Sequence, residues 1–206
     1  MIVPTAPTRR AHIFVDAKDD QRENGASGPS PPTTWRRTFN PIGRLFAAAS
    51  TFVCGPNALS QNPDQERNLR ANPEVIPSMV SETIRWQTPL AYMRRTALED
   101  FELHGKTIKA GEKIAMWYVS GNRDETVIDR PNDYWIERPR VRQHLSFGFG
   151  IHRCVGNRLA ELQLKIIWEE ILKRFPRIDV VGPPKRVYSS FVHGYEHLPV
   201  VIPTRN

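Results

Sequence analysis

The sequence predicts a mainly α-helical fold with small β-sheets, of the α+β class. After Cys154, apolar residues recur at spacings of three and four, which is typical of a long amphipathic helix. Short alternating segments with glycine turns, at 101–119 and in the tail at 178–203, predict β-strands. With 206 residues, of which 39% are hydrophobic and 25% charged, the chain has the composition of a globular protein.

The first quarter of the chain differs from the rest. Residues 1–44 contain GASGPSPPTT and charges of both signs without sustained periodicity, a pattern typical of disorder. We therefore predict a leader over residues 1–54 and a folded part over residues 55–206.

The folded part is expected to begin with two helices. Residues 62–74 supply a short polar helix between two Asn-Pro breaks, and a second helix begins at Pro77, because proline is tolerated in a first turn. Residues 101–119 predict a hairpin that leads into an apolar stretch. The proline-rich, charged segment 122–143 follows neither period and predicts a long connecting loop.

The long helix is expected to start just after Cys154 and to end before Pro176, since proline cannot continue a helix. An apolar stripe along one face predicts which side chains it buries. The stripe comprises Ala160, Leu164, Ile167, Ile171 and Phe175, widened by Leu159, Trp168 and Leu172.

Composition excludes several classes of protein. No apolar run approaches the ~20 residues that span a bilayer, so no membrane span is expected. Two cysteines allow at most one disulfide, which favours a reducing compartment, and we expect the cytoplasm. The net charge of +7 is not gathered into one tract with stacking aromatics, so no nucleic-acid partner is expected.

The segment FGFGIHRCVG, residues 147–156, places a cysteine in a glycine-rich loop ahead of the long helix. A helix N-terminus beside Arg153 and Arg158 favours a thiolate at Cys154, which is a good ligand for a soft metal. On these residues alone, Cys154 is either such a ligand or a small buried apolar side chain. A zinc site with His152 requires two further ligands at suitable spacing, which the sequence does not offer.

The same segment resembles the haem-binding signature of cytochrome P-450 monooxygenases, in which phenylalanine, glycine, a basic residue, cysteine and glycine stand at fixed offsets. The resemblance implies the C-terminal part of the cytochrome P-450 fold, with Cys154 as the axial thiolate ligand of the iron of haem b. The loop residues that it assigns to cofactor binding are Phe147, Gly148, Gly150, His152, Cys154 and Gly156.

A second match to the family lies upstream. Glu82 and Arg85, in ETIR, reproduce its glutamate-x-x-arginine helix, and at i,i+3 the two side chains share one helix face. Arg138 stands where the family has an arginine that completes a buried triad. The resemblance implies that the triad is structural and supports the cysteine loop.

Further roles follow from the resemblance alone. Arg94 and His152 align with residues that bind the haem propionates, although Arg94 is otherwise an ordinary surface residue of a strand. The substrate pocket is expected to be lined by the turn from Thr88 to Met93 and by part of the tail. Its named residues are Thr88, Leu90, Phe191 and Val192.

Within the family, the chain looks most similar to bacterial alkane and fatty-acid terminal hydroxylases. This implies a small apolar substrate, O₂, and electrons from a ferredoxin and its ferredoxin reductase. The side chains that either dock an acidic ferredoxin or form a plain solvated face are Arg142, Arg153, Arg158 and Lys165.

The resemblance covers about residues 55–202, whereas the family's chains are much longer. We therefore expect the N-terminal helices to be missing, and with them the acid–threonine pair that activates oxygen. The alternative to an active monooxygenase is a non-catalytic haem-binding fragment, and a small haem sensor is a third possibility.

Overall fold

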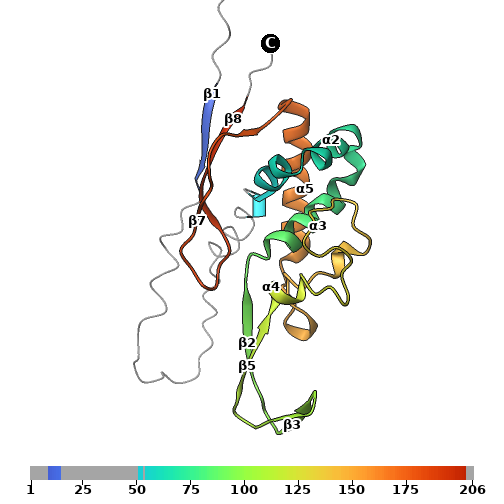
Figure 1. Cartoon of the computed structure of the whole chain (residues 1–206), viewed down its shortest axis with the longest axis vertical. Coiled ribbons are helices and arrows are strands. Elements are labelled where there is room, and N and C mark those ends of the chain that lie inside the picture. The colour runs from blue at the N-terminus through green and yellow to red at the C-terminus, as the bar shows by residue number, and fades with distance from the viewer. Residues whose placement is uncertain (1–8, 15–50, 53, 203–206) are drawn as a thin grey trace, which may run out of the picture.

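A computed structural model describes residues 9–14, 51–52 and 54–202 (Figure 1). Helices form one side of the molecule, a sheet forms the other, and a two-stranded ribbon projects away from both. The predicted class, mainly α-helical with small sheets, is confirmed. The predicted leader stays a prediction, because only residues 9–14 and 51–52 and Cys54 of it are described.

The two expected helices are present. α2 spans Pro63–Ala71 and is followed by a single 3-10 turn, η2, over Pro73–Val75. α3 spans Ile76–Gln87, so it starts one residue before the predicted proline. It ends because Thr88 takes a left-handed φ of 43°.

The long helix, α5, spans Asn157–Arg174 and packs along α3. Leu164, Trp168 and Ile171 are buried as predicted, but Leu159 is 60% exposed and Ile167 is 39% exposed. The predicted stripe was too wide, because the core contacts only the face centred on Leu164, and Leu159 lies on the far side of the helix.

The hydrophobic core lies between α3, α5 and β8 (Tyr195–Ile202). A helix over residues 51–61, of which 53 is not described, closes it on one side. The contact is tight, since a Cβ on Gly55 would lie 2.5 Å from the Trp168 ring.

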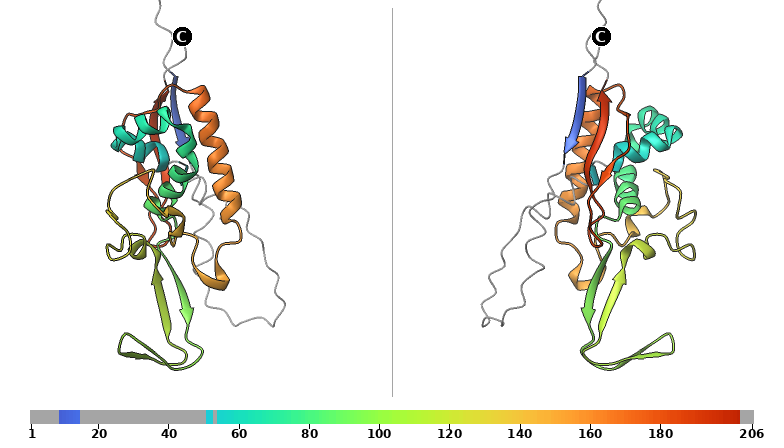
Figure 2. Two further views of the ribbon diagram at one scale, coloured as in Figure 1. Left: turned by 90° about the vertical axis from the view of Figure 1, so that its right-hand side faces the viewer. Right: turned by 60° about the vertical axis from the view of Figure 1, so that its left-hand side comes forward.

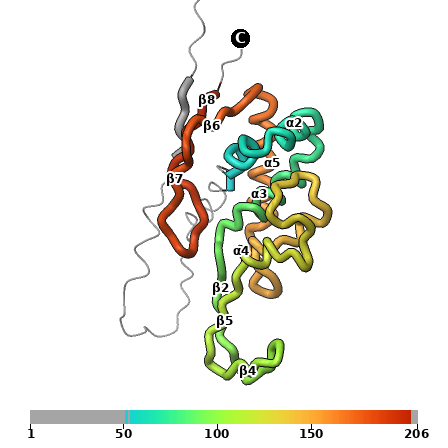
Figure 3. The backbone as a smooth tube through the Cα atoms, in the orientation of Figure 1, coloured from blue at the N-terminus to red at the C-terminus, as the bar shows by residue number. Residues whose placement is uncertain are grey.

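Strand β8 is the centre of the main sheet. It pairs antiparallel with β6 (Asp179–Val180), β7 (Lys185–Arg186) and β1 (Arg9–Phe14). Figure 1 labels β1, β7 and β8, and Figure 3 labels β6. Strand β1 lies within residues 1–44, for which disorder is expected. The structure differs from this expectation at the six residues of β1. The rest of residues 1–50 lies outside the described part of the chain.

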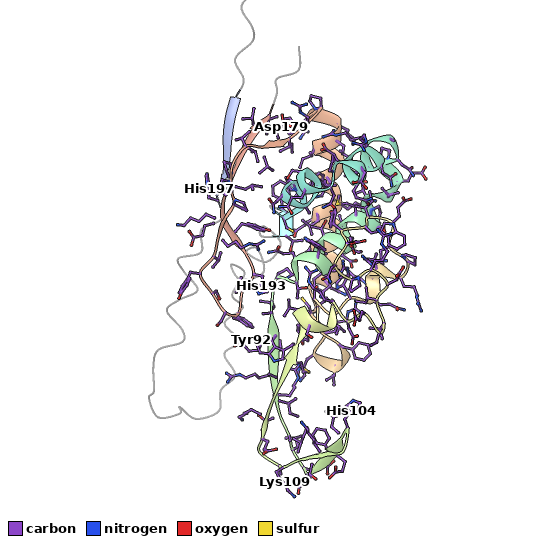
Figure 4. All side chains as sticks on the ribbon, viewed as in Figure 1. Tyr92, His104, Lys109, Asp179, His193 and His197 are labelled. Carbon is purple, nitrogen blue, oxygen red and sulfur yellow. The ribbon has the colours of Figure 1, made fainter. Side chains whose placement is uncertain are left out.

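Residues 101–119 do not form one hairpin. Strands β3 (Phe101–Leu103) and β4 (Lys106–Ile108) pair with each other, whereas β5 (Lys113–Trp117) pairs back with β2 (Tyr92–Thr96). The two pairs make the projecting ribbon seen in Figures 2 and 3. Figure 4 shows Tyr92 near its base and His104 at its tip.

The apolar run predicted to reach residue 119 stops earlier as a strand. Tyr118 and Val119 begin the short helix α4 (Tyr118–Gly121), which turns the chain towards the long loop. That loop, at 122–143, has no regular structure apart from the 3-10 turn η3 (Val141–Gln143), as expected.

Candidate functional site

The cysteine loop, residues 147–156, is a compact turn closed by a backbone hydrogen bond. Cys154 N donates to Phe147 O at 2.8 Å. Gly148 and Gly150 adopt φ of 72° and 75°, where residues with a side chain are strained. Both glycines are therefore required by the shape of the loop, whatever the loop binds.

Cys154 is exposed at the surface of this loop. Phe149, Ile151 and Val155 are 81%, 97% and 78% exposed, so uncovered apolar side chains surround the cysteine in the sequence. The interpretation of a small buried side chain is wrong for Cys154. The small buried cysteine is Cys54 instead, which is 1% exposed and whose pKa is raised to about 12 by burial.

The cysteine loop suits a metal that is already ligated within a larger cofactor, because it offers a single thiol as a ligand. Within the described ranges, no group of three or more His, Cys, Asp or Glu side chains is placed to hold a metal ion. An exposed thiol, a glycine-rich backbone and an apolar surface fit haem, because the porphyrin nitrogens already ligate the iron and the protein needs to add only a thiolate. They do not fit zinc, which needs further protein ligands.

The other residues expected at the cofactor are distributed around the loop. Gly156 is the N-cap of α5, and His152 ends the 3-10 turn η4 (Gly150–His152) at the surface. Arg94 is exposed on β2, opposite Ala115 of β5. Both basic side chains are accessible to an anion, and their pairing with propionates stays a prediction.

Behind the loop, Glu82 lies between two guanidinium groups. Arg85 Nε and Nη2 donate to the two Glu82 oxygens at 2.7 and 2.8 Å, and Arg138 Nε donates to Glu82 Oε2 at 3.0 Å. Glu82, Arg85 and Arg138 are 0%, 2% and 6% exposed. The triad is therefore buried and mutually paired, which is the arrangement that makes buried charge tolerable.

The excess positive charge of the triad is met by backbone carbonyls. Arg85 Nη1 donates to Asn122 O at 2.7 Å and to Pro131 O at 2.9 Å. Arg138 Nη2 donates to Asp133 O at 2.8 Å. These bonds explain how a long loop without regular structure is held in one conformation.

Asn122 connects the triad to the cysteine loop. It is 0% exposed, its Nδ2 donates to Thr88 Oγ1 and Ser146 Oγ, and its Oδ1 accepts from Leu145 N. Ser146 Oγ in turn donates to Ile84 O at 2.8 Å. A continuous hydrogen-bonded path thus runs from Arg85 to the residue that precedes Phe147.

His144 is buried beside this path without a full set of partners. It is 6% exposed, its Nδ1 accepts from Ser146 N, and its Nε2 has no hydrogen-bond partner in the described structure. Burial, with Arg153 nearby, lowers the pKa of His144 to about 4. The imidazole is therefore neutral at physiological pH, and its ring packs 5.4 Å from that of Phe147.

The two segments expected to line a substrate pocket lie side by side. Ala91 N donates to Phe191 O at 2.8 Å, and Leu90 and Val192 form a bridge. The Tyr92 ring lies 5.5 Å from that of Phe191. Their role in substrate binding stays a prediction.

Thr88 is the most deeply buried of the residues expected in that pocket, followed by Val192, which is 8% exposed. Thr88 is 1% exposed, and its hydroxyl donates to Arg85 O at 2.7 Å and accepts from Asn122. Its side chain therefore holds the turn from within.

Sequence reasoning missed Asn122, Ser146 and His144. The available signal was weak, because each is a single polar residue in an irregular segment and has no spacing to recognise. Tyr118 was also missed, and its hydroxyl limits the loop, since a Cβ on Gly148 would lie 3.0 Å from it.

Three of the four basic residues considered for docking, Arg142, Arg158 and Lys165, border a groove of about 840 Å³ between α5, η3 and the start of α3, and Arg153 lies outside its lining. Arg142 is exposed and pairs with Glu161 of α5 at 2.5 Å. The cationic residues lining the groove are Arg138, Arg140, Arg142, Arg158 and Lys165. In the described part of the chain, no helix is long and apolar enough to cross a membrane.

The cytochrome P-450 family model matches residues 58–189. Linalool 8-monooxygenase of Pseudomonas putida is 42% identical over 144 residues, which are 70% of this chain and 35% of that protein. The solved cytochrome P-450-153 from Novosphingobium aromaticivorans has a TM-score of 0.74 at 48% identity, over 78% of this chain and 43% of its own. A second solved protein of group 153, from Sphingomonas sp. PAMC 26605, has a TM-score of 0.74 at 52% identity, over 76% of this chain and 39% of its own.

The chain thus spans about two fifths of the length of the relatives that it matches. The match includes the cysteine loop and the buried triad, so the similarity extends over the residues that the sequence predicts to bind and support haem. By sequence and by structure, this chain belongs to the cytochrome P-450 family.

Proposed function

We propose that this chain is the haem-ligating part of a monooxygenase that hydroxylates a terminal carbon of medium-chain alkanes or fatty acids. The observation that carries the proposal is the exposed Cys154 in a glycine-shaped loop, held from behind by a buried polar network. When bound, haem b with a thiolate ligand activates O₂ so that one oxygen atom enters a C–H bond and the other leaves as water.

The chain's own residues have distinct roles in this proposal. Cys154 would ligate the haem iron as a thiolate, and Arg94 and His152 would pair with the haem carboxylates. Gly148 and Gly150 allow the backbone to approach the porphyrin. The path from Arg85 through Asn122 keeps the loop in position.

The substrate is proposed to lie against the apolar surface made by the turn and the tail. Leu90, Phe191 and Val192 offer no charged group, which suits an alkyl chain. The resemblance of the sequence to bacterial alkane and fatty-acid terminal hydroxylases supports attack at a terminal carbon, and the 48% identity to the solved group 153 protein supports a cytochrome P-450. The named substrate of the Pseudomonas relative, linalool, is also a small and largely apolar molecule.

Electrons are proposed to come from a ferredoxin and its ferredoxin reductase. The groove beside α5 is lined by four accessible cationic side chains and by the buried Arg138, and its one carboxylate, Glu161, pairs with Arg142. Such a surface attracts an acidic partner and accelerates its association. The two free cysteines favour the cytoplasm as the site of action.

One observation favours a second candidate, a haem-binding fragment without activity. The chain spans about two fifths of its relatives, and oxygen activation requires a water-excluding pocket and controlled protons. The acid–threonine pair that the family resemblance implies for proton delivery is not reproduced in residues 1–54.

Turnover decides between the two candidates. Haem-loaded protein is incubated with octane or laurate, a ferredoxin and its reductase, and the products are identified by mass spectrometry. We expect the terminal alcohol from the wild type, none from Cys154→Ser, and wild-type product from Cys54→Ala. A thiolate-type haem spectrum without product would reject the monooxygenase and leave the haem-binding fragment.

The pocket is tested by product distribution. Phe191→Ala is expected to shift the preferred chain length, because it removes an aromatic wall. Tyr188→Ala is the matched control, since Tyr188 is 94% exposed. If Phe191→Ala and Tyr188→Ala show the same preference for substrate chain length, Phe191 does not line the pocket.

A further inference from the structure

Thr88 has an unusual backbone conformation at the end of α3. Its φ and ψ are 43° and 72°, in the left-handed region, which a β-branched residue seldom adopts. The next residue is Pro89, and a residue that precedes proline favours an extended backbone instead. A conformation of this kind is strained and persists only where the surrounding structure enforces it. The contacts of Thr88 therefore hold it against its own preference.

The Thr88 side chain makes two hydrogen bonds of opposite direction, which a hydroxyl can make and a methyl group cannot. Its Oγ1 donates to Arg85 O at 2.7 Å and accepts from Asn122 Nδ2 at 2.9 Å. Thr88 is only 1% exposed, so its side chain is not available to a substrate. Any effect of Thr88 on the site therefore passes through the groups that it holds.

One of the two bonds leads to the cysteine loop. The Asn122 amide divides its N–H groups between Thr88 Oγ1 and Ser146 Oγ, and its Oδ1 accepts from Leu145 N at 2.6 Å. Ser146 Oγ donates in turn to Ile84 O at 2.8 Å, in the last turn of α3. The hydroxyls of Thr88 and Ser146 thus hold one amide from two sides, and both are anchored to the end of the same helix.

In the other direction, the backbone after Thr88 is fixed to the tail that is expected at the substrate. Pro89 O accepts from His193 N at 2.9 Å, and Ala91 N donates to Phe191 O at 2.8 Å. The φ and ψ of Thr88 set the direction in which this backbone leaves α3. Thr88 therefore determines where the turn and the tail attached to it lie.

We propose that Thr88 is a positioning residue that couples the turn at residues 88–93 to the cysteine loop. Its backbone directs the turn and its hydroxyl holds Asn122, so a displacement of the turn is passed to the residues that precede Cys154. The contact of this turn with substrate rests on the proposed function, whereas the coupling itself requires neither substrate nor turnover.

Hydrogen exchange of the backbone amides, measured by mass spectrometry on the full chain without substrate, tests the coupling. Thr88→Val keeps the branched shape of the side chain and removes both of its hydrogen bonds. We expect it to accelerate exchange within residues 145–156 by roughly ten-fold relative to α5, because Asn122 loses a buried partner. Thr88→Ser keeps the hydroxyl and should exchange like the wild type.

The coupling is also tested from the loop. Ser146→Ala removes the second partner of the Asn122 N–H groups and should accelerate exchange within residues 88–93, because coupling between two sites is reciprocal. This variant leaves residue 88 intact, so it tests the coupling even where Thr88→Val does not fold. Thr96→Val is the matched control, since Thr96 is exposed on β2 and lies outside the path. It should leave exchange in both segments unchanged.

Three results would overturn the proposal. The first is an acceleration after Thr88→Val that is as large in α5 as in residues 145–156, which would make Thr88 a general stabiliser of the fold. The second is an acceleration confined to the segment that carries the substitution. The third is a Thr88→Ser variant that exchanges like Thr88→Val. A wild type that lacks hydroxylase activity would keep the exchange differences and would count against the proposed function alone.

Discussion

The two sides of the cysteine loop are built differently. Behind it, Asn122 and Ser146 are 0% and 7% exposed and fully engaged in hydrogen bonds. In front of it, Cys154 is exposed, and Ile151 is 97% exposed. The shape of the loop therefore comes from this chain alone, whereas its reactive face is left open. Substitutions behind the loop should cost stability, and substitutions in front should cost ligand binding.

The largest loss of stability is expected from Glu82→Gln. It leaves the Arg85 and Arg138 guanidinium groups buried without a carboxylate, which costs about 3–5 kcal/mol when one partner of a buried pair is removed. Urea unfolding followed by circular dichroism measures the change. Glu99→Gln, at an exposed position, is the control and should unfold like the wild type. An unchanged midpoint for Glu82→Gln would mean that the triad does not stabilise the fold.

A smaller loss is expected from Asn122→Ala. It leaves Leu145 N without its buried partner, at about 1–3 kcal/mol, whereas the hydroxyls of Thr88 and Ser146 keep their bonds to Arg85 O and Ile84 O. The same unfolding experiment measures it, with Asn132→Ala as the exposed control. Faster proteolysis within residues 145–156 should accompany the loss. Cleavage elsewhere, with the loop still protected, would contradict a link between Asn122 and the loop.

His144 should make stability depend on pH to a modest extent. Its pKa is lowered in the folded chain to about 4, chiefly by burial and then by Arg153, Arg85 and Arg142, whereas the unfolded value is near 6.5. The folded state thus favours the neutral imidazole, so its contribution is present above pH 6.5 and is lost as pH falls towards 4. Between pH 7.5 and 5.5 the loss is about 1 kcal/mol.

His144→Phe should remove that part of the pH dependence. His104→Asn is the control, because His104 is exposed at a left-handed turn that asparagine tolerates. Equal slopes of stability against pH for the wild type and His144→Phe would show that another group carries the effect.

The smallest effect on stability is expected in front of the loop. Ile151→Ser should change the free energy of unfolding by less than about 0.5 kcal/mol, because the side chain is 97% exposed. It should weaken haem binding, measured by titration of the apoprotein, because it removes apolar contact area. If Ile151→Ser lost as much stability as Asn122→Ala, the front and the back of the cysteine loop would not differ in their contribution to stability.

The sequence predicted those parts of the site that have a fixed spacing. The loop from Phe147 to Gly156 and the pair Glu82–Arg85 stand at set offsets, and Arg138 was placed through the family resemblance. Asn122 and Ser146 were missed because their partners are 23 to 62 residues away and only tertiary contacts unite them. His144, whose hydrogen bond is to the nearby Ser146 N, was missed because a single polar residue has no spacing to recognise.

The fold was predictable to a similar degree. Helical periods located α3 and α5 within a residue or two, because an amphipathic pattern reports local structure. The pairing of β5 with β2 was missed, since the sequence shows that a segment is extended but not which strand it meets. Leu159, which is 60% exposed, was assigned to the core face of α5 for the same reason, because an apolar residue indicates burial without identifying its partner.

The central claim is that Cys154, and not Cys54, ligates the haem iron. The most direct measurement is the Soret band of the reduced, haem-loaded protein under carbon monoxide. The account predicts the red-shifted band of a thiolate-ligated carbonyl complex for the wild type and for Cys54→Ala, and its loss in Cys154→Ser. A red-shifted band that persists in Cys154→Ser, or that never forms in the wild type, would contradict it.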